Sequence, residues 1–268
     1  MTAALQPVSV RIPLWSGLGE APADLGPTVV TIGVFDGLHR GHRRLVDHAR
    51  RIADERGLPL VLVTFDPHPA RVLGLARDTA TLTTLEHRTE LAGAAGADAV
   101  CALRFTRDLA RLSPRTFARR VLADTLGADA VVIGANFTFG AKAAGDVTTL
   151  QELGIDLGFT THPVPLLKAV DTPCSSSYIR RCLCAGDLDG ATRALGRPHR
   201  VAGNRSGDQV TLAHDTALPP PGRYRGTVDG LPVLVEVTGA HTLRIIAGPA
   251  TGDGSTTVSF HGTEEGHR

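Results

Sequence analysis

A strand, a glycine-rich turn and a helix follow one another from residue 28 onward, and this order constrains the fold more than any other feature. The apolar run Val29–Ile32 predicts a strand covered on both faces. Glycines at 33, 37 and 41 then interrupt the strand. From residue 43 onward, apolar residues recur at spacings of three and four; they are Leu45, Val46, Ala49, Ile52 and Ala53. This order is typical of an α/β protein with a parallel sheet.

The turn itself predicts a phosphate site. It carries His39 and His42 at the start of the predicted helix, where free backbone N–H groups and the positive dipole end favour anions. Glycine lets a phosphate approach the backbone closely, and two imidazoles can donate hydrogen bonds to phosphate oxygens. The histidine pair indicates nucleotide chemistry. The structural alternative is a pair of solvated histidines on a basic helix start.

Strand-like and helix-like stretches continue to alternate along the chain. Strands are predicted over 58–65, 97–103, 129–134 and 160–164. Helices are predicted over 83–95, 113–126, from 147, and over 175–185 and 186–196. The alternation predicts a Rossmann-like α/β fold, a parallel sheet with helices on both faces.

Two further loops follow predicted strands, and ligands bind beyond the carboxyl ends of strands in open parallel sheets. In the first loop, two prolines end the strand and leave Asp66 and His68 as candidate site residues. The alternative is a proline-braced loop in which His68 is only structural. The second loop places Asn136 beside Phe137 and Phe139, a pattern that suits a flat ring system. Core packing is the alternative for each phenylalanine alone.

Serines and arginines open the helix that begins near residue 175. Ser176 and Ser177 sit in its first turn, and Arg180 and Arg181 follow. Hydroxyl groups, backbone N–H groups and guanidinium groups together can clamp a phosphate. A plain serine N-cap with solvated arginines is the alternative.

Together these motifs resemble the prokaryotic FAD synthetases, bifunctional riboflavin kinase/FMN adenylyltransferase enzymes. The turn reads G-x-F-D-G-x-H-x-G-H, and F-x-P-H-P, G-x-N-F-x-F-G and S-S-S-x-I-R follow in the family's order between Thr28 and about Val201. Where this chain has Asn136, many members of the family have aspartate. The resemblance implies an enzyme that transfers AMP from ATP to FMN with Mg2+, giving FAD and pyrophosphate.

The resemblance also assigns roles to individual residues. It implies catalytic roles for His39, His42 and Arg180. It implies ATP contacts for Gly33, Phe35, Asp36, Gly41, Ser176, Ser177 and Arg181. It implies flavin contacts for Asn136, Phe137, Phe139, Asp66 and His68. The serine-arginine motif is expected to close over the ATP phosphates opposite the histidines, and the metal ligands are not assigned.

The residues after Pro198 have a different pattern, short alternating stretches between glycines and prolines, which predicts a small antiparallel sheet or partial barrel. We therefore expect a lead-in over 1–27, a nucleotidyltransferase domain over 28–198 and a small β domain over 199–268. A riboflavin kinase module follows here in the family. Its P-T-A-N motif is missing from this chain, and Glu236 is a candidate for the place of its glutamate. We expect no kinase activity.

Composition excludes several other classes of protein. The net charge of +1 and the 42% hydrophobic content indicate a globular core and no coating of a polyanion, so no nucleic-acid partner is expected. No apolar run is long enough to span a membrane, and the N-terminus lacks a signal pattern. The four cysteines are expected as free thiols in the cytoplasm. Oligomeric state is left open. Two alternative functions stay open, transfer to another phosphorylated acceptor and non-catalytic binding of flavin or nucleotide.

Overall fold

The chain divides into two compact units in the computed structural model, which describes residues 11–165, 167–169, 172–249 and 252–264. Unit 1 comprises Met1–Phe35, His42–Leu75 and Leu85–Leu166, and unit 2 comprises Asp36–Gly41, Ala76–Thr84 and Leu167–Arg268. The first ten residues of the expected lead-in lie outside the described residues. The division by motif into 28–198 and 199–268 stays a prediction; the compact units group the helices after residue 175 with the C-terminal strands.

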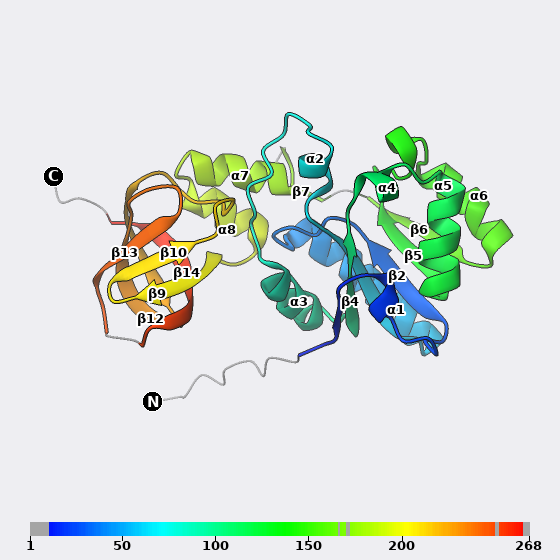
Figure 1. The fold of residues 1–268 in the computed structure, drawn as a ribbon, viewed down its shortest axis with the longest axis horizontal. Helices are drawn as coiled ribbons and strands as arrows, with labels where there is room; N and C mark the ends of the chain where they lie inside the picture. Colours follow the sequence, from blue (N-terminus) through cyan, green and yellow to red (C-terminus); the bar gives the residue numbers. More distant parts are fainter. Residues whose placement is uncertain (1–10, 166, 170–171, 250–251, 265–268) are drawn as a thin grey trace. The chain divides into compact units, whose positions relative to one another are not determined.

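Unit 1 is built on a six-stranded sheet in the order β1-β4-β3-β2-β5-β6. Figure 1 labels β4, β2, β5 and β6 of this sheet. All neighbouring strands pair in parallel. The strands are β1 (Leu14–Trp15), β2 (Thr28–Ile32), β3 (Leu60–Asp66), β4 (Ala99–Arg104), β5 (Ala128–Gly134) and β6 (Thr160–Val164). Every residue of β2 is buried, as the apolar run predicted. The sequence did not predict β1, whose two residues are too few for a periodic pattern.

Helices cover the sheet, and each amphipathic helix buries the face that carries its periodic apolar residues. The five apolar residues predicted for the first helix are the buried residues of α1. The elements are η1 (Leu18–Glu20), α1 (Arg40–Arg56), α2 (Pro69–Val72), α3 (Leu85–Ala94), α4 (Arg107–Ala110), α5 (Pro114–Phe117), the π-helical η2 (Ala118–Thr125), η3 (Ala141–Ala143) and α6 (Val147–Leu157). One apolar core joins η2 and α6 to alternate residues of the strands. The one-turn helices α2 and α4 were missed because four residues carry no periodicity.

Unit 2 contains a closed antiparallel barrel in the order β10-β13-β12-β11-β14-β9, where the sequence predicted a small antiparallel sheet or partial barrel. Its strands are β9 (His199–Ser206), β10 (Gln209–Leu212), β11 (Gly222–Val228), β12 (Leu231–Val237), β13 (Thr242–Ala247) and β14 (Gly254–Thr263). The sequence missed β9, because Arg200, Gly203, Asn204 and Arg205 hide its alternation. This strand pairs with both β10 and β14 and so closes the barrel.

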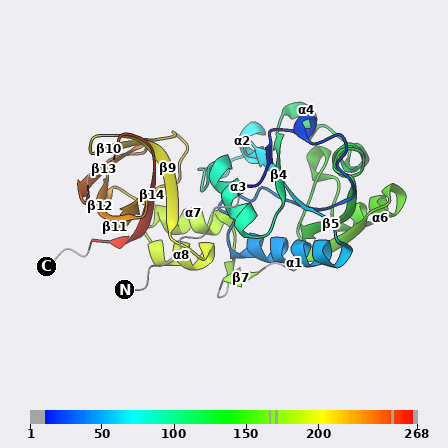
Figure 2. The same ribbon diagram turned by 90° about the horizontal axis from the view of Figure 1, so that it is seen from below.

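Two helices pack beside the barrel, α7 (Ser176–Cys184) and α8 (Leu188–Leu195), and Figure 2 shows them next to each other and to β9 and β14. A short ladder of β7 (Lys168–Ala169) and β8 (Thr172–Pro173) precedes them. One apolar core runs from Val235 and Phe260 inside the barrel to Ile179 of α7 and Leu195 of α8. The barrel therefore supports the helix that carries the serine-arginine motif. Among the described residues, no helix has the length and apolar character needed to cross a membrane.

Candidate functional site

The sheet of unit 1 has its switch point between β2 and β5. The strand order runs from β2 outward through β3 and β4 on one side, and then resumes with β5 on the other. Loops at the carboxyl ends on either side of such a point form the usual ligand crevice of α/β sheets. The Gly33–Phe35 turn follows β2, the Asn136 loop follows β5, and the His68 loop follows β3. The topology therefore brings three predicted motifs to one edge of the sheet.

Phe35 is held in a conformation that few non-glycine residues adopt. Its φ is +52° and its ring is completely buried. The ring lies 5.0 Å from that of His42, measured between centroids, at an edge-on angle of 64°. Strain of this kind persists only when the surroundings hold it in place, and it gathers at functional turns. Phe35 thus fixes one side of the His42 ring.

A hydrogen-bond relay that the sequence did not reveal steadies the same turn. The Thr64 hydroxyl donates to the Val34 carbonyl at 2.7 Å, and Arg88 Nη1 donates to the Thr64 hydroxyl oxygen at 2.9 Å. Arg88 belongs to α3 and is 6% exposed. Its neighbours in the sequence, His87 and Thr89, give no local signal of this role. The relay ties the carboxyl ends of β2 and β3 together.

The aromatic loop after β5 separates its two phenylalanines by burial. Phe139 is 7% exposed and packs against Phe117 with ring centroids 5.9 Å apart. Phe137 is half-buried and stacks on Phe139 at 5.6 Å and 15°. Asn136 is exposed, and its Oδ1 lies over Gly134, 3.3 Å from an added Cβ. Phe139 is thus a core residue that supports Phe137, and Phe137 and Asn136 reach the surface.

The loop after β3 also places its two candidates differently. Asp66 is exposed and precedes a cis peptide bond to Pro67. His68 is the N-cap of α2, and its Nδ1 accepts from the Ala70 backbone N–H at 3.1 Å. This bond requires an unprotonated Nδ1, so one nitrogen of His68 has the structural role that a proline-braced loop would give it. A contact between His68 and the flavin stays a prediction.

In unit 2, the turn Asp36–Gly41 is organised around a buried carboxylate. Asp36 is 2% exposed. It accepts hydrogen bonds from the backbone N–H groups of Leu82 and Thr83 at 3.1 and 3.0 Å and from the Thr83 hydroxyl at 3.2 Å. Thr83 Oγ1 in turn accepts from the Gly37 N–H at 3.0 Å. The expected ATP contact Asp36 therefore positions the turn from inside the protein.

Helix α7 joins this turn through two of the residues that the sequence singled out. The Ser176 hydroxyl donates to the Asp36 carbonyl at 2.7 Å, and Arg180 Nη2 pairs with Asp36 Oδ2 at 2.5 Å. Arg180 Nε also donates to the Ala80 carbonyl at 2.6 Å. The structure thus brings the turn that carries His39 and the serine-arginine helix together within unit 2.

The other polar residues of α7 have different surroundings. Ser175 is the N-cap, and its hydroxyl oxygen accepts from the Tyr178 N–H at 3.2 Å. Ser177 is exposed. Arg181 is also exposed, with its guanidinium carbon 6.0 Å from the centre of the Tyr178 ring. Ser177 and Arg181 therefore remain accessible to an anion, whereas Arg180 is buried.

His39 is 5% exposed and uncharged at neutral pH. Burial lowers its pKa to about 4; Asp36 opposes this shift, and Arg197 and Arg180 reinforce it. Its Nδ1 lies 3.7 Å from the Cys174 sulfur. A neutral imidazole can donate from one nitrogen only, so His39 acts as a hydrogen-bonding group and not as a fixed positive charge. His42, the second histidine, belongs to unit 1 and is half-buried.

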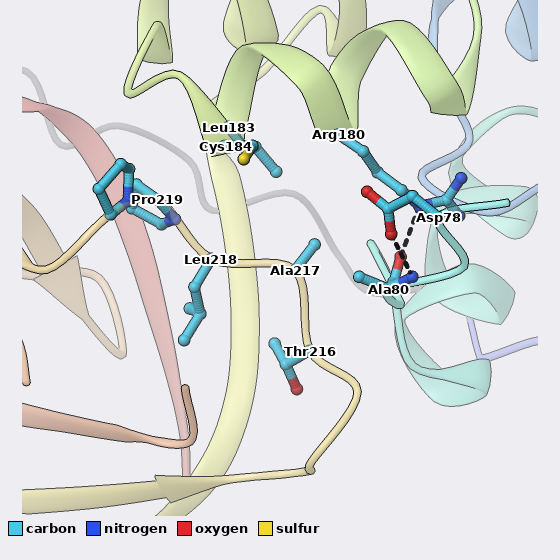
Figure 3. Close-up of a pocket in the computed structure, with 10 residues that line it drawn as sticks. Asp78, Ala80, Arg180, Leu183, Cys184, Thr216, Ala217, Leu218 and Pro219 are labelled. Atoms are coloured by element: carbon cyan, nitrogen blue, oxygen red, sulfur yellow. Dashed lines mark hydrogen bonds between the residues drawn. The ribbon is translucent and has the colours of Figure 1, made fainter. Parts of the chain in front are cut away.

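A cavity of about 380 Å³ lies within unit 2, and Arg180 is one of the residues that line it (Figure 3). Its walls are α7, the segment around Ala80 and the stretch from Thr216 to Pro220. Figure 3 shows Arg180 bonded to Ala80, whose N–H donates to Asp78 at 2.9 Å. The lining is mostly apolar, and Arg180 is already bonded to Asp36 and Ala80. These bonds fix the segment that carries the partners of Asp36.

Metal ligands do not gather into a dedicated site in the described part of the chain. No group of three or more histidine, cysteine, aspartate or glutamate side chains there could hold an ion. All four cysteines are free, and Cys184 alone among them is exposed.

The parallel sheet, its switch-point loops and the polar turn are features that nucleotide-binding α/β proteins share. A sequence profile of the FAD synthetase family matches residues 21–178, a span that holds the turn, both loops and the start of α7. The chain belongs to the FAD synthetase family.

Relatives with curated names agree with this assignment. Bifunctional riboflavin kinase/FMN adenylyltransferases match at 38% identity in Pseudomonas fluorescens, over 65% of this chain and 56% of the relative, and at 35% in Listeria monocytogenes, over 65% and 55%. The protein of that name from Escherichia coli matches at 32% over 83% of this chain and 71% of its own length. The chain therefore spans about half the length of the first two relatives.

A solved structure described as a macrolide-efflux protein from Streptococcus pneumoniae shares the fold, with a TM-score of 0.80 over 95% of this chain and 91% of that one. Its sequence identity is 19%, so the likeness concerns the fold alone.

Proposed function

We propose that this chain is an FMN adenylyltransferase, an enzyme that transfers AMP from ATP to FMN and releases pyrophosphate. The observation that carries the proposal is the joining of the histidine turn to the serine-arginine helix through Asp36, Ser176 and Arg180. The family match over residues 21–178, which holds the histidine turn and the serines that open α7, supports the same reading.

The reaction needs positioning and charge stabilisation more than a protein nucleophile. A phosphate oxygen of FMN attacks the α-phosphorus of ATP in line, a new P–O bond forms, and the bond to the bridging oxygen breaks. The pyrophosphate leaves with that bonding pair. Bound Mg2+ would neutralise charge on the phosphates.

The proposed roles in the phosphate chemistry follow from burial. His39 and His42 stabilise the developing charge on the α- and β-phosphates as hydrogen-bond donors. The exposed Ser177 and Arg181 contact the departing pyrophosphate. Arg180 and Ser176 hold Asp36 and act mainly as positioning residues, a change from the direct contacts that the resemblance implies. Gly33, Phe35 and Gly41 shape the turn.

The proposed flavin contacts lie after β5 and β3. Phe137 offers the half-buried ring face on which an isoalloxazine would stack, and Phe139 supports it from the core. Asn136 supplies donor and acceptor groups at the surface. Asp66 and His68 are the remaining proposed contacts. We also propose that the protein acts in the cytoplasm, as the free thiols lead us to expect.

We further propose that the chain lacks riboflavin kinase activity. Glu236 pairs with Arg244 at 2.5 Å and lies 3.8 Å from Arg223, so two arginines engage the candidate for the family's glutamate. Val235 and Phe260, inside the barrel, are completely buried in its apolar core. Incubation with riboflavin, ATP and Mg2+ should leave riboflavin unchanged, and accumulation of FMN would refute this part of the proposal.

One assay tests the main proposal. The purified chain is mixed with FMN, ATP and Mg2+, and the flavins are separated by chromatography. FAD and an equal amount of pyrophosphate should form. The degenerate C-terminal module motivates a parallel screen of other phosphorylated acceptors and nucleoside triphosphates, and a product from one of these without FAD would favour the alternative acceptor. Tight flavin or nucleotide binding without any product would favour a binding protein.

A further inference from the structure

The C-terminal end of α8, which lies outside the family motifs, contacts the histidine turn. Gly196 ends the helix in the left-handed region with a φ of +77°, and this redirects the chain so that Arg197 follows. Arg197 Nη2 donates to the Gly37 carbonyl at 2.6 Å, and Nη1 lies 3.4 Å from the Leu38 carbonyl. Nη1 also donates to the Leu195 carbonyl at 3.3 Å. One guanidinium thus spans two consecutive carbonyls of the turn and the last carbonyl of the helix.

Side chains also pack closely between the turn and the end of α8. A Cβ added to Gly37 would lie 3.4 Å from Leu195, and one added to Gly196 would lie 3.2 Å from the Arg40 stem. Leu38 is 3% exposed. Gly37 and Leu38 both have positive φ values, +81° and +33°. Leu38 pays a conformational cost there that the neighbouring contacts must offset.

The bonds to Arg197 determine where the N–H groups of the turn point. In a planar trans peptide the N–H of the next residue points opposite to the carbonyl. With the carbonyls of Gly37 and Leu38 directed at Arg197, the N–H groups of Leu38 and His39 point away from it. Successive N–H groups oriented by a turn form a concave anion site. The charge of Arg197 also favours the uncharged state of the His39 ring.

We infer that Arg197 is a positioning residue for the phosphate chemistry: its guanidinium fixes the peptides of Gly37 and Leu38, so that the following N–H groups and the His39 ring keep the orientation that a triphosphate requires. This inference rests on the proposed function, and it assigns a role in catalysis to a residue outside the matched span of the family profile. Lysine cannot replace the guanidinium, because an ammonium is a compact donor that does not bridge separated carbonyls in a fixed plane.

The test compares Arg197→Met and Arg197→Lys with Arg193→Met, a matched loss of charge at an exposed position in the last turn of α8. Amide hydrogen exchange by mass spectrometry reports on the turn without any need for activity. Steady-state kinetics of FAD formation reports on catalysis. For Arg197→Met we expect exchange in peptides covering residues 36–41 to accelerate at least about tenfold, with the barrel peptides unchanged. We expect kcat to fall about 10- to 100-fold with little change in KM for FMN.

The two readouts separate the inference from the proposed function. Arg197→Lys should recover less than half of the lost kcat, and Arg193→Met should match the wild type in both measurements. If the wild type makes no FAD, the proposed function fails, and the exchange of the turn peptides still decides whether Arg197 fixes the turn. Unchanged exchange in Arg197→Met would overturn the inference. So would equal acceleration in the turn and the barrel, because Arg197 would then support the whole unit.

Discussion

Arg180 and Asp36 form an ion pair in which Nη2 and Oδ2 lie 2.5 Å apart and each side chain is 3% exposed. Their positions in the sequence are 144 residues apart, and the pair joins the turn that carries His39 to the helix that carries Ser176. The backbone N–H groups of Leu82 and Thr83 complete the coordination of the carboxylate. A buried charge that is paired and hydrogen-bonded in this way is costly to leave without its partner.

Removing one partner of this pair should therefore destabilise unit 2. Arg180→Met leaves a buried carboxylate and is expected to lower the free energy of unfolding by about 3 kcal/mol. The double variant Asp36→Asn, Arg180→Met removes both charges and should lose less than the single variant. Urea denaturation followed by circular dichroism measures both. A loss below about 1 kcal/mol in Arg180→Met would contradict the structural role of the pair.

His42 should matter for the chemical step more than for the fold. Its substitution by alanine is expected to lower the rate of FAD formation at least about 100-fold, the scale of one lost hydrogen-bond donor to a developing charge. His48→Ala, in the same helix α1, is the matched control and should retain the wild-type rate. Initial rates at saturating ATP and FMN test this. A loss in His42→Ala below about tenfold would mean that this imidazole is not central.

The two phenylalanines after β5 should separate binding from stability. Phe137→Ala removes a half-buried stacking surface and should raise KM for FMN about tenfold, with little change in melting temperature. Phe139→Ala empties a buried site and should lower the free energy of unfolding by about 3 kcal/mol or more. Thermal melts and flavin titrations distinguish these outcomes. An unchanged KM in Phe137→Ala would remove the flavin role from this residue.

His199 makes the stability of unit 2 depend on pH. Burial lowers its pKa to about 4 from 6.5, and its Nε2 donates to the Ala217 carbonyl at 2.8 Å. Above pH 6.5 the ring is neutral in both folded and unfolded chains, whereas below it only the unfolded chain takes up the proton. The stability associated with the neutral ring is therefore present above pH 6.5 and is lost as the pH falls through about 4.

His199→Gln tests this dependence, because an amide can replace the donor without titrating. Between pH 6.5 and 5, the wild type should lose about 2 kcal/mol of unfolding free energy more than the variant. Urea titrations at several pH values measure the difference. Equal pH slopes for the two proteins would show that His199 does not titrate as its burial requires.

Periodic and capped elements were predictable from the sequence because their signals are local. The apolar face of α1 was predicted residue by residue, and β6 agrees in its bounds with the predicted strand. The parallel sheet follows from the alternation of such elements. Local propensity and apolar period act over a few residues, so one sequence suffices to recognise them.

Partnerships between distant residues could not be predicted in the same way. Asp36 was expected to contact ATP, and its burial against Arg180 depends on chain topology that no local pattern encodes. Arg197 and Arg88 escaped notice because an arginine in a sequence gives no sign of the carbonyl or hydroxyl that it will bond. The polar residues of β9 give no alternating pattern, and the strand forms because it pairs with β10 on one edge and β14 on the other.

Isotope transfer tests the central claim most directly. The chain is incubated with FMN, Mg2+ and ATP labelled either at the α-phosphate or at the γ-phosphate, and the flavin and pyrophosphate fractions are counted separately. Adenylyl transfer predicts that the α label enters FAD and the γ label enters pyrophosphate. The account is contradicted if the α label stays out of the flavin while ATP binds, or if the γ label enters the flavin.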